Sequence, residues 1–150
     1  MAQKIKHQLF FAHPPKAVWE YLTNADLIQL WLMKNNFKPI VGHKFQFTAG
    51  CSADIDFSGV IDCTVTEVKP YERLAYTWQC YSINGGVNVD SVVNWTLIPK
   101  EGGTELLLEH NGFKIMENLP LFNSMQEGWL KHMTKIGTNL NAETHANTNA

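Results

Sequence analysis

The segment Gly59–Trp78 constrains the fold more than any other part of this chain. In its first half, apolar Ile61, Cys63 and Val65 alternate with polar residues, as in a strand with one side facing water. A second alternating run, rich in large aromatic residues, follows Pro70. Proline has a fixed φ and no N–H, so it suits the connection between two strands and not the interior of either. The segment therefore predicts a β-hairpin.

The same period of two recurs on both sides of this hairpin. It predicts further strands around four groups of residues: Ile5–Phe11; Phe45 and Phe47; Val93, Trp95 and Leu97; and Leu106, Leu108 and His110. Asn84-Gly85-Gly86 and Gly102-Gly103 are turn signals, because glycine and asparagine reach positive φ at low cost. Tight connections between successive strands imply an antiparallel meander.

Two other parts of the chain change to a helical period. After a stop at His13-Pro14-Pro15, the spacing predicts two short helices that divide near Asn24 and end at Trp31. Near the C-terminus, a stripe of apolar residues predicts one helix over Leu121–Leu140, about 30 Å long. The stripe consists of Phe122, Met125, Trp129, Met133, Ile136 and Leu140. The tail Ala142–Ala150 has no such stripe, and we expect it to be disordered.

Composition argues against several classes of protein. A chain of 150 residues fits one domain, which we place at residues 1–141 and which buries roughly 70% of its unfolded surface. A formal net charge of -2 provides no positive field for nucleic acid or an anionic membrane. The N-terminus does not resemble a signal peptide, and no apolar run approaches the roughly 20 residues of a membrane helix, so we expect a soluble cytoplasmic protein. Three cysteines without C-x-x-C spacing argue against disulfides or zinc, and we expect neither a metal nor a cofactor.

The order of these elements, together with several short motifs, resembles a known family. The motifs are Pro14-Pro15-Lys16-Ala17-Val18-Trp19, Leu30-Trp31-Leu32-Met33, Val41-Gly42, the Gly59–Trp78 hairpin, Gly102-Gly103-Thr104-Glu105-Leu106, Leu108-Glu109-His110-Asn111-Gly112-Phe113 and Gly128-Trp129. On these residues the chain resembles the heat shock protein 90 ATPase activator homologue-like family, within the START-like or SRPBCC helix-grip superfamily. The resemblance covers nearly the whole chain apart from the tail and the Gln79–Asn88 loop.

This resemblance implies an α+β helix-grip fold, in which a curved antiparallel sheet wraps around a long C-terminal helix. Two short helices follow the first strand, and an apolar cavity lies between the sheet and the long helix. Aromatic side chains make good walls for an apolar ligand, although the same residues would also make an ordinary core. The candidate ligand-binding residues are Trp31, Phe45, Phe47, Cys63, Tyr76, Trp78, Trp95, His110, Trp129 and Met133.

The sequence predicts no catalytic residue. His110 falls on the inferred inner face, but a lone imidazole without a paired nucleophile, acid or metal is not a mechanism. We predict that His110 serves structure or ligand orientation. Asp54 and Asp56 lie in a polar loop, where we expect them to contact water. The chain contains no H-E-x-x-H, G-x-S-x-G, P-loop or dinucleotide-binding motif.

Three functions remain open. The first is a binding protein for a small apolar or amphipathic molecule, as a monomer or weak homodimer. The second, implied by the resemblance, is a co-chaperone that stimulates a heat-shock ATPase; the eukaryotic activator has an additional N-terminal domain, for which we expect no room here. The third is a cavity enzyme of the cyclase, dehydratase or hydrolase type, since related helix-grip folds include such catalysts. We favour binding, with fatty acids, phenolics and polyketide-like aromatics as the first ligands to test.

Overall fold

The computed structural model describes residues 3–116 and 118–148, with side chains described as far as residue 143. Within these residues the elements follow the predicted order, with one short additional strand, β2. They are β1 (Ile5–Phe11), α1 (Pro15–Thr23), α2 (Ala25–Trp31), β2 (Lys34–Asn35), β3 (Lys44–Thr48), β4 (Val60–Lys69), β5 (Arg73–Tyr81), β6 (Val87–Lys100), β7 (Gly103–Met116) and α3 (Leu119–Thr148).

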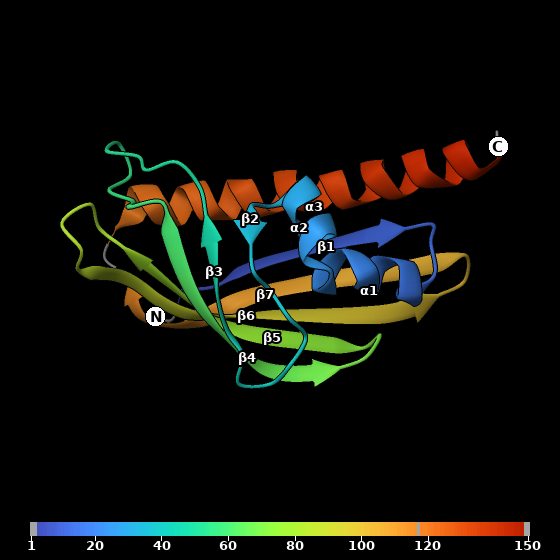
Figure 1. Ribbon diagram of the computed structural model, residues 1–150, viewed down its shortest axis with the longest axis horizontal. Helices are drawn as coiled ribbons and strands as arrows, with labels where there is room; N and C mark the ends of the chain where they lie inside the picture. The colour runs from blue at the N-terminus through green and yellow to red at the C-terminus, as the bar shows by residue number, and fades with distance from the viewer. Residues whose placement is uncertain (1–2, 117, 149–150) are drawn as a thin grey trace.

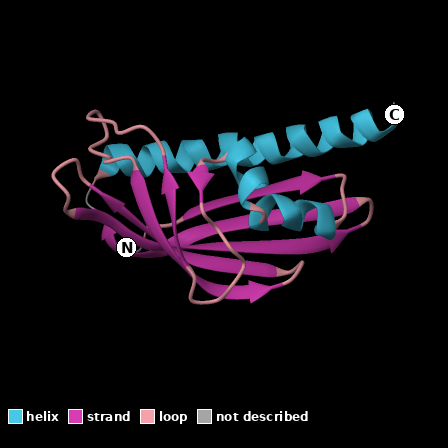
Figure 2. Cartoon of the chain, in the orientation of Figure 1, coloured by secondary structure: helices cyan, strands magenta, loops and turns pink. Residues whose placement is uncertain are grey.

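All the strands belong to one antiparallel sheet with the order β1-β7-β6-β5-β4-β3-β2. Figure 1 shows the sheet curving beneath α3, which runs along its inner side. Figure 2 shows the two short helices beside the strands, and both of them contact α3. From β2 to β7 the chain forms the predicted meander, while β1 pairs with β7, so that Ile5 lies opposite His110. The predicted α+β helix-grip fold is confirmed.

The two short helices form because each has a suitable start. Pro15 stands in the first turn of α1, where the N–H that it lacks would have no intrahelical partner. Asn24 separates the helices, and its Oδ1 accepts hydrogen bonds from the backbone N–H groups of Asp26 at 3.0 Å and Leu27 at 3.4 Å. An asparagine cap of this kind is worth about 1 kcal/mol. The chain therefore begins a new helix at the predicted position.

Helix α3 packs its apolar stripe against the sheet. Trp129, Met133, Ile136 and Leu140 are buried in the core. On the same side of the helix, Gly137 approaches β1 so closely that an added Cβ would lie 2.9 Å from the ring of Phe11. The helix continues to Thr148, past the point where the sequence predicts a disordered tail, and residues 149–150 lie outside the described part of the chain.

Tryptophan rings form the centre of the core. The ring of Trp129 lies 5.1 Å from that of Trp78 and 5.5 Å from that of Trp95, and Trp95 lies 5.9 Å from Trp31. All four side chains are buried. Aromatic pairs at these distances contribute about 0.5–1.5 kcal/mol beyond the burial of their surface. The tryptophans therefore join α2 and α3 to the middle of the sheet.

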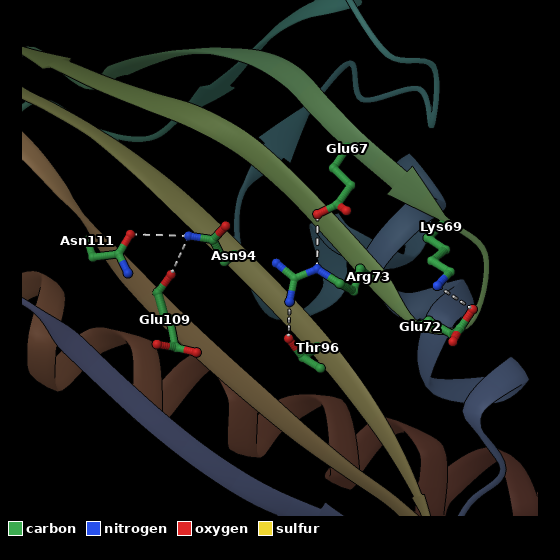
Figure 3. A network of polar contacts seen from close by, with 8 residues as sticks. All are labelled: Glu67, Lys69, Glu72, Arg73, Asn94, Thr96, Glu109 and Asn111. Atoms are coloured by element: carbon green, nitrogen blue, oxygen red, sulfur yellow. Dashed lines mark hydrogen bonds and ion pairs between the residues drawn. The ribbon is translucent and has the colours of Figure 1, made fainter.

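The opposite face of the sheet is polar, which accounts for the alternation along its strands. Figure 3 shows Arg73 of β5 between Glu67 of β4 and Thr96 of β6, with both contacts at 3.0 Å. Farther along, Asn94 donates a hydrogen bond to Asn111 at 3.2 Å. Half-exposed contacts of this kind contribute at most about 1 kcal/mol each. Among the described helices, none has the length and apolar character needed to cross a bilayer.

Candidate ligand-binding site

A cavity of about 180 Å³, partly open to solvent, lies beside the first half of α3. Its walls come from α3, from the segment that follows α2, from the β3–β4 connection, and from strands β4 and β5. The lining residues are Leu32, Met33, Ile55, Phe57, Ile61, Trp78, Cys80, Leu121, Ser124, Met125, Gly128, Trp129 and His132. Most of these side chains are apolar. The family resemblance implied a cavity in this part of the fold.

The β3–β4 connection is fastened to the start of α3. The Asn118 Nδ2 group donates a hydrogen bond of 2.7 Å to the carbonyl of Ile55, and its Oδ1 accepts one of 3.1 Å from the N–H of Leu121. Asn118 therefore caps α3 and holds the connection with a single side chain. At the other end of the connection, Gly59 has φ of 96°, and an added Cβ would lie 2.6 Å from the carbonyl oxygen of Ala49. Glycine is required there.

Two neighbouring rows of α3 residues form one wall of the cavity. Met125 and Trp129 belong to the predicted apolar stripe, and Leu121 extends it by one turn toward the start of α3. Beside them, Ser124, Gly128 and His132 recur every four residues, so they share a second row. An added Cβ on Gly128 would meet nothing nearer than Cδ2 of His132, at 3.8 Å. The glycine therefore leaves this wall open.

All ten sequence-predicted site residues are buried. Trp78 and Trp129 line the cavity. The other eight belong to the buried core: Trp31, Phe45, Phe47, Cys63, Tyr76, Trp95, His110 and Met133. Phe45 and Cys63 also border a separate polar groove with residues such as Lys44 and Gln46. Ligand contact by the ten residues stays a prediction. The second row of α3 was not among the predicted site residues, although its regular spacing next to the apolar stripe is visible in the sequence.

His110 lies in a polar network within the core. The indole N–H of Trp129 donates to Nδ1 of His110 at 3.0 Å, and Nε2 lies 2.7 Å from the hydroxyl oxygen of Ser91. An indole can only donate, so the proton of the neutral ring is on Nε2 and is donated to Ser91. The Ser91 hydroxyl in turn donates to the carbonyl of Trp78 at 3.0 Å. Every polar atom of this network has a partner.

This geometry excludes the Ser91–His110 pair as a nucleophile and its base. A general base needs a free lone pair toward the hydroxyl, and Nε2 presents a proton instead. Burial lowers the pKa of His110 from 6.5 to about 3, so the ring is neutral at physiological pH. Neither residue lines the cavity. The arrangement supports the predicted structural role of His110.

His132 is the histidine that lines the cavity. Its Nδ1 lies 2.9 Å from the backbone carbonyl of Trp31. A carbonyl can only accept, so Nδ1 carries the proton and Nε2 keeps a lone pair. Burial lowers the pKa of His132, the charges of Lys135 and Lys131 lower it further, and the Trp31 carbonyl opposes them. The neutral ring is therefore a hydrogen-bond acceptor beside the cavity.

Two further groups in the wall are polar but unreactive. Burial raises the pKa of the Cys80 thiol to about 12, an effect that the indole N–H of Trp78 partly opposes. A thiol with so high a pKa is a poor nucleophile at neutral pH. The Trp78 N–H lies near the Cys80 sulfur, but it makes no hydrogen bond within the described part of the chain. Among the same residues, no cluster of His, Cys, Asp or Glu side chains is arranged to hold a metal ion.

Comparisons with known proteins agree with this architecture. A family profile described as "Activator of Hsp90 ATPase homolog 1-like protein" matches residues 12–141. The solved structure of MLL2253 from Mesorhizobium loti is 34% identical, with 93% of this chain and 98% of that chain covered and a TM-score of 0.82. BH1534 from Bacillus halodurans is 23% identical, with 92% and 98% covered and a TM-score of 0.72. A comparison with curated proteins found no match.

A third structure is that of DynU16, a protein of the dynemicin biosynthetic locus. It is 20% identical, and the alignment covers 92% of this chain and 47% of that chain, with a TM-score of 0.72. At this identity the likeness shows the fold alone. The shared class is the START-like helix grip, a curved sheet that wraps around a C-terminal helix. The chain belongs to the Activator of Hsp90 ATPase homolog 1-like family, as the sequence motifs indicated.

Proposed function

We propose that this protein binds a small apolar or amphipathic molecule, about one aromatic ring in size, in the cavity beside α3. The composition of the cavity wall carries the proposal, because apolar walls with a few placed polar groups are typical of small-molecule sites. An engineered apolar cavity of about 150 Å³ takes up benzene. A cavity of about 180 Å³ suits a molecule of similar size. A fatty acid or polyketide would have to extend through the open side.

The chemistry of the nearby groups supports binding rather than catalysis. Burial keeps the Cys80 thiol protonated, and the hydrogen-bond direction in the Ser91–His110 pair prevents base catalysis there. The place of DynU16 in a biosynthetic locus suggests biosynthetic small molecules as further test ligands, although the likeness to that protein concerns the fold.

Thermal unfolding with toluene and p-cresol tests the proposal. A ligand present at 100 times its dissociation constant should raise the free energy of unfolding by about 2.7 kcal/mol. Gly128→Leu places a side chain toward the cavity and should abolish this shift. Gln126→Leu adds the same side chain at an exposed position of α3 and should preserve it. Equal shifts in both variants would place the binding site elsewhere.

Family membership supports a second candidate function, stimulation of a heat-shock ATPase. The test is the rate of ATP hydrolysis by such an ATPase with and without this protein. If the rate rises while neither compound changes the unfolding temperature, the co-chaperone function should replace ligand binding as the proposal. A rise in both the rate of ATP hydrolysis and the unfolding temperature would indicate that the protein has both functions.

A further inference from the structure

A few polar groups stand among the apolar side chains of the cavity wall. His132 and Ser124 belong to the same row of α3, one turn either side of Gly128. Both indoles of the wall are donors: the Trp129 N–H donates to His110, and the Trp78 N–H makes no hydrogen bond within the described residues. His132 is therefore the ring acceptor that a bound molecule could reach from the cavity.

One edge of the His132 ring is held by a hydrogen bond, and the opposite edge faces Gly128. Nδ1 is held by the Trp31 carbonyl at 2.9 Å. On the opposite edge, Cδ2 faces Gly128, where an added Cβ would be 3.8 Å away. Nε2 is bonded to Cδ2, and Gly128 itself lines the cavity. The ring edge that carries Nε2 and its free lone pair therefore faces Gly128, in the row of α3 that borders the cavity.

The charges around the cavity argue against an anionic ligand. Among the described lining residues, none is a lysine, arginine, aspartate or glutamate. Lys131 and Lys135 are exposed on α3 and do not line the cavity. A carboxylate would lose its hydration without gaining an opposite charge, and it would meet the lone pair of a neutral imidazole. An O–H group instead supplies the proton that this lone pair accepts.

Resting on the proposed function, we propose that the ligand is a neutral hydroxylated ring compound, such as a simple phenol, whose O–H donates to Nε2 of His132. The cavity volume of about 180 Å³ limits the part of the ligand that is enclosed to about one ring. His132 would act as a specificity-determining residue, because it distinguishes a hydrogen-bond donor from an apolar or anionic group at the same place.

Four compounds of similar shape test this on the unmodified protein: p-cresol, toluene, 4-methylanisole and p-toluate. We expect p-cresol to bind about tenfold more tightly than toluene in titrations at pH 7.5, since one net hydrogen bond changes a binding constant by roughly that factor. 4-Methylanisole keeps the oxygen without the O–H donor, so it should bind less tightly than p-cresol. p-Toluate should bind most weakly. Equal affinities for p-cresol and toluene, or tightest binding of p-toluate, would overturn this inference.

Two variants assign the preference to His132. His132→Phe removes the acceptor and should reduce the preference for p-cresol over toluene to less than twofold, with toluene still bound. His132→Gln returns an amide oxygen and should restore part of the preference. An unchanged preference in a folded His132→Phe variant would contradict the inference while leaving the proposed function intact. Binding of none of the four compounds to the unmodified protein would refute both, and toluene binding that Gly128→Leu blocks would support the proposed function alone.

Discussion

The buried ring of His110 shows how one residue makes stability depend on pH. The unfolded chain protonates this ring near pH 6.5, whereas burial in the fold lowers its pKa to about 3. Between these values the unfolded state binds one more proton, so stability falls as the pH falls. Because Trp129 donates to Nδ1, the folded state has no unprotonated place for that additional proton without breaking a hydrogen bond.

We therefore expect the free energy of unfolding to fall below pH 6.5 with a contribution from His110 of about 1.4 kcal/mol per pH unit. Urea denaturation between pH 5 and 6.5 measures the slope, above the range where most carboxylates titrate. His110→Gln can still accept from Trp129 and donate to Ser91, but it does not titrate. The slope of its unfolding free energy against pH should therefore be smaller by about 1.4 kcal/mol per pH unit, the contribution of one proton. Identical slopes in the two proteins would show that His110 is not the group responsible.

The glycines of α3 offer a second comparison at the level of single residues. Replacing glycine by alanine within a helix stabilises it by up to about 1 kcal/mol when the new methyl has room. Gly128 has that room, whereas at Gly137 the methyl would lie 2.9 Å from the Phe11 ring. Gly128→Ala should therefore raise the free energy of unfolding, and Gly137→Ala should lower it by about 1–3 kcal/mol, as overpacked positions do. Chemical denaturation measures both. Shifts of the same sign would contradict this account.

At the scale of elements, α3 depends on Trp129. This side chain is buried, contacts Trp78 and Trp95, and supplies the N–H that His110 accepts. Trp129→Ala should cost about 3–5 kcal/mol, the usual effect of truncating a buried aromatic residue. Leu130→Ala, at the next and exposed position, should change stability by less than about 0.5 kcal/mol. If Trp129→Ala is as mild as Leu130→Ala, α3 does not pack on the sheet through this residue.

Asn118 joins two elements, and its two hydrogen bonds can be separated. Asn118→Ser keeps a cap for α3 and loses the amide that holds Ile55, whereas Asn118→Ala loses both. We expect the serine variant to retain nearly full stability and the alanine variant to lose about 1 kcal/mol. Hydrogen exchange of residues 50–58 should become faster in both variants. Unchanged exchange in that segment would show that the Asn118–Ile55 contact does not hold the cavity wall.

At the scale of the whole molecule, one curved sheet is packed on its inner side and wet on its outer side. The tryptophan cluster fills the middle of the inner side, and the cavity lies toward the end where α3 begins. Polar contacts such as Arg73–Glu67 occupy the outer side. A ligand in the cavity would contact α3 and the β3–β4 connection together, so binding would stabilise the fold as a unit.

Sequence alone determined the features that depend on local period. Alternation identified the strands and their inner faces, including the face of Leu106, Leu108 and His110, because successive side chains of a strand point to opposite sides. Helical spacing identified α3 and its buried stripe, and Asn24 marked the division between the short helices. The family motifs added the architecture, since they specify how such elements are combined. These predictions needed no knowledge of distant contacts.

Tertiary structure alone decided where packing is complete and where it is not. The pairing of β1 with β7 joins residues 93 to 105 positions apart. The cavity exists only where α3, the segment after α2 and the β3–β4 connection fail to close on one another. Both histidine tautomers likewise follow from single partners, Trp129 for His110 and the Trp31 carbonyl for His132. Side-chain period says which face is buried, but it does not say which buried side chains fill the space between elements. For that reason the sequence could predict the core, and the family resemblance implied a cavity, while the residues that line the cavity, including its second row on α3, and the free acceptor of His132 came from the fold.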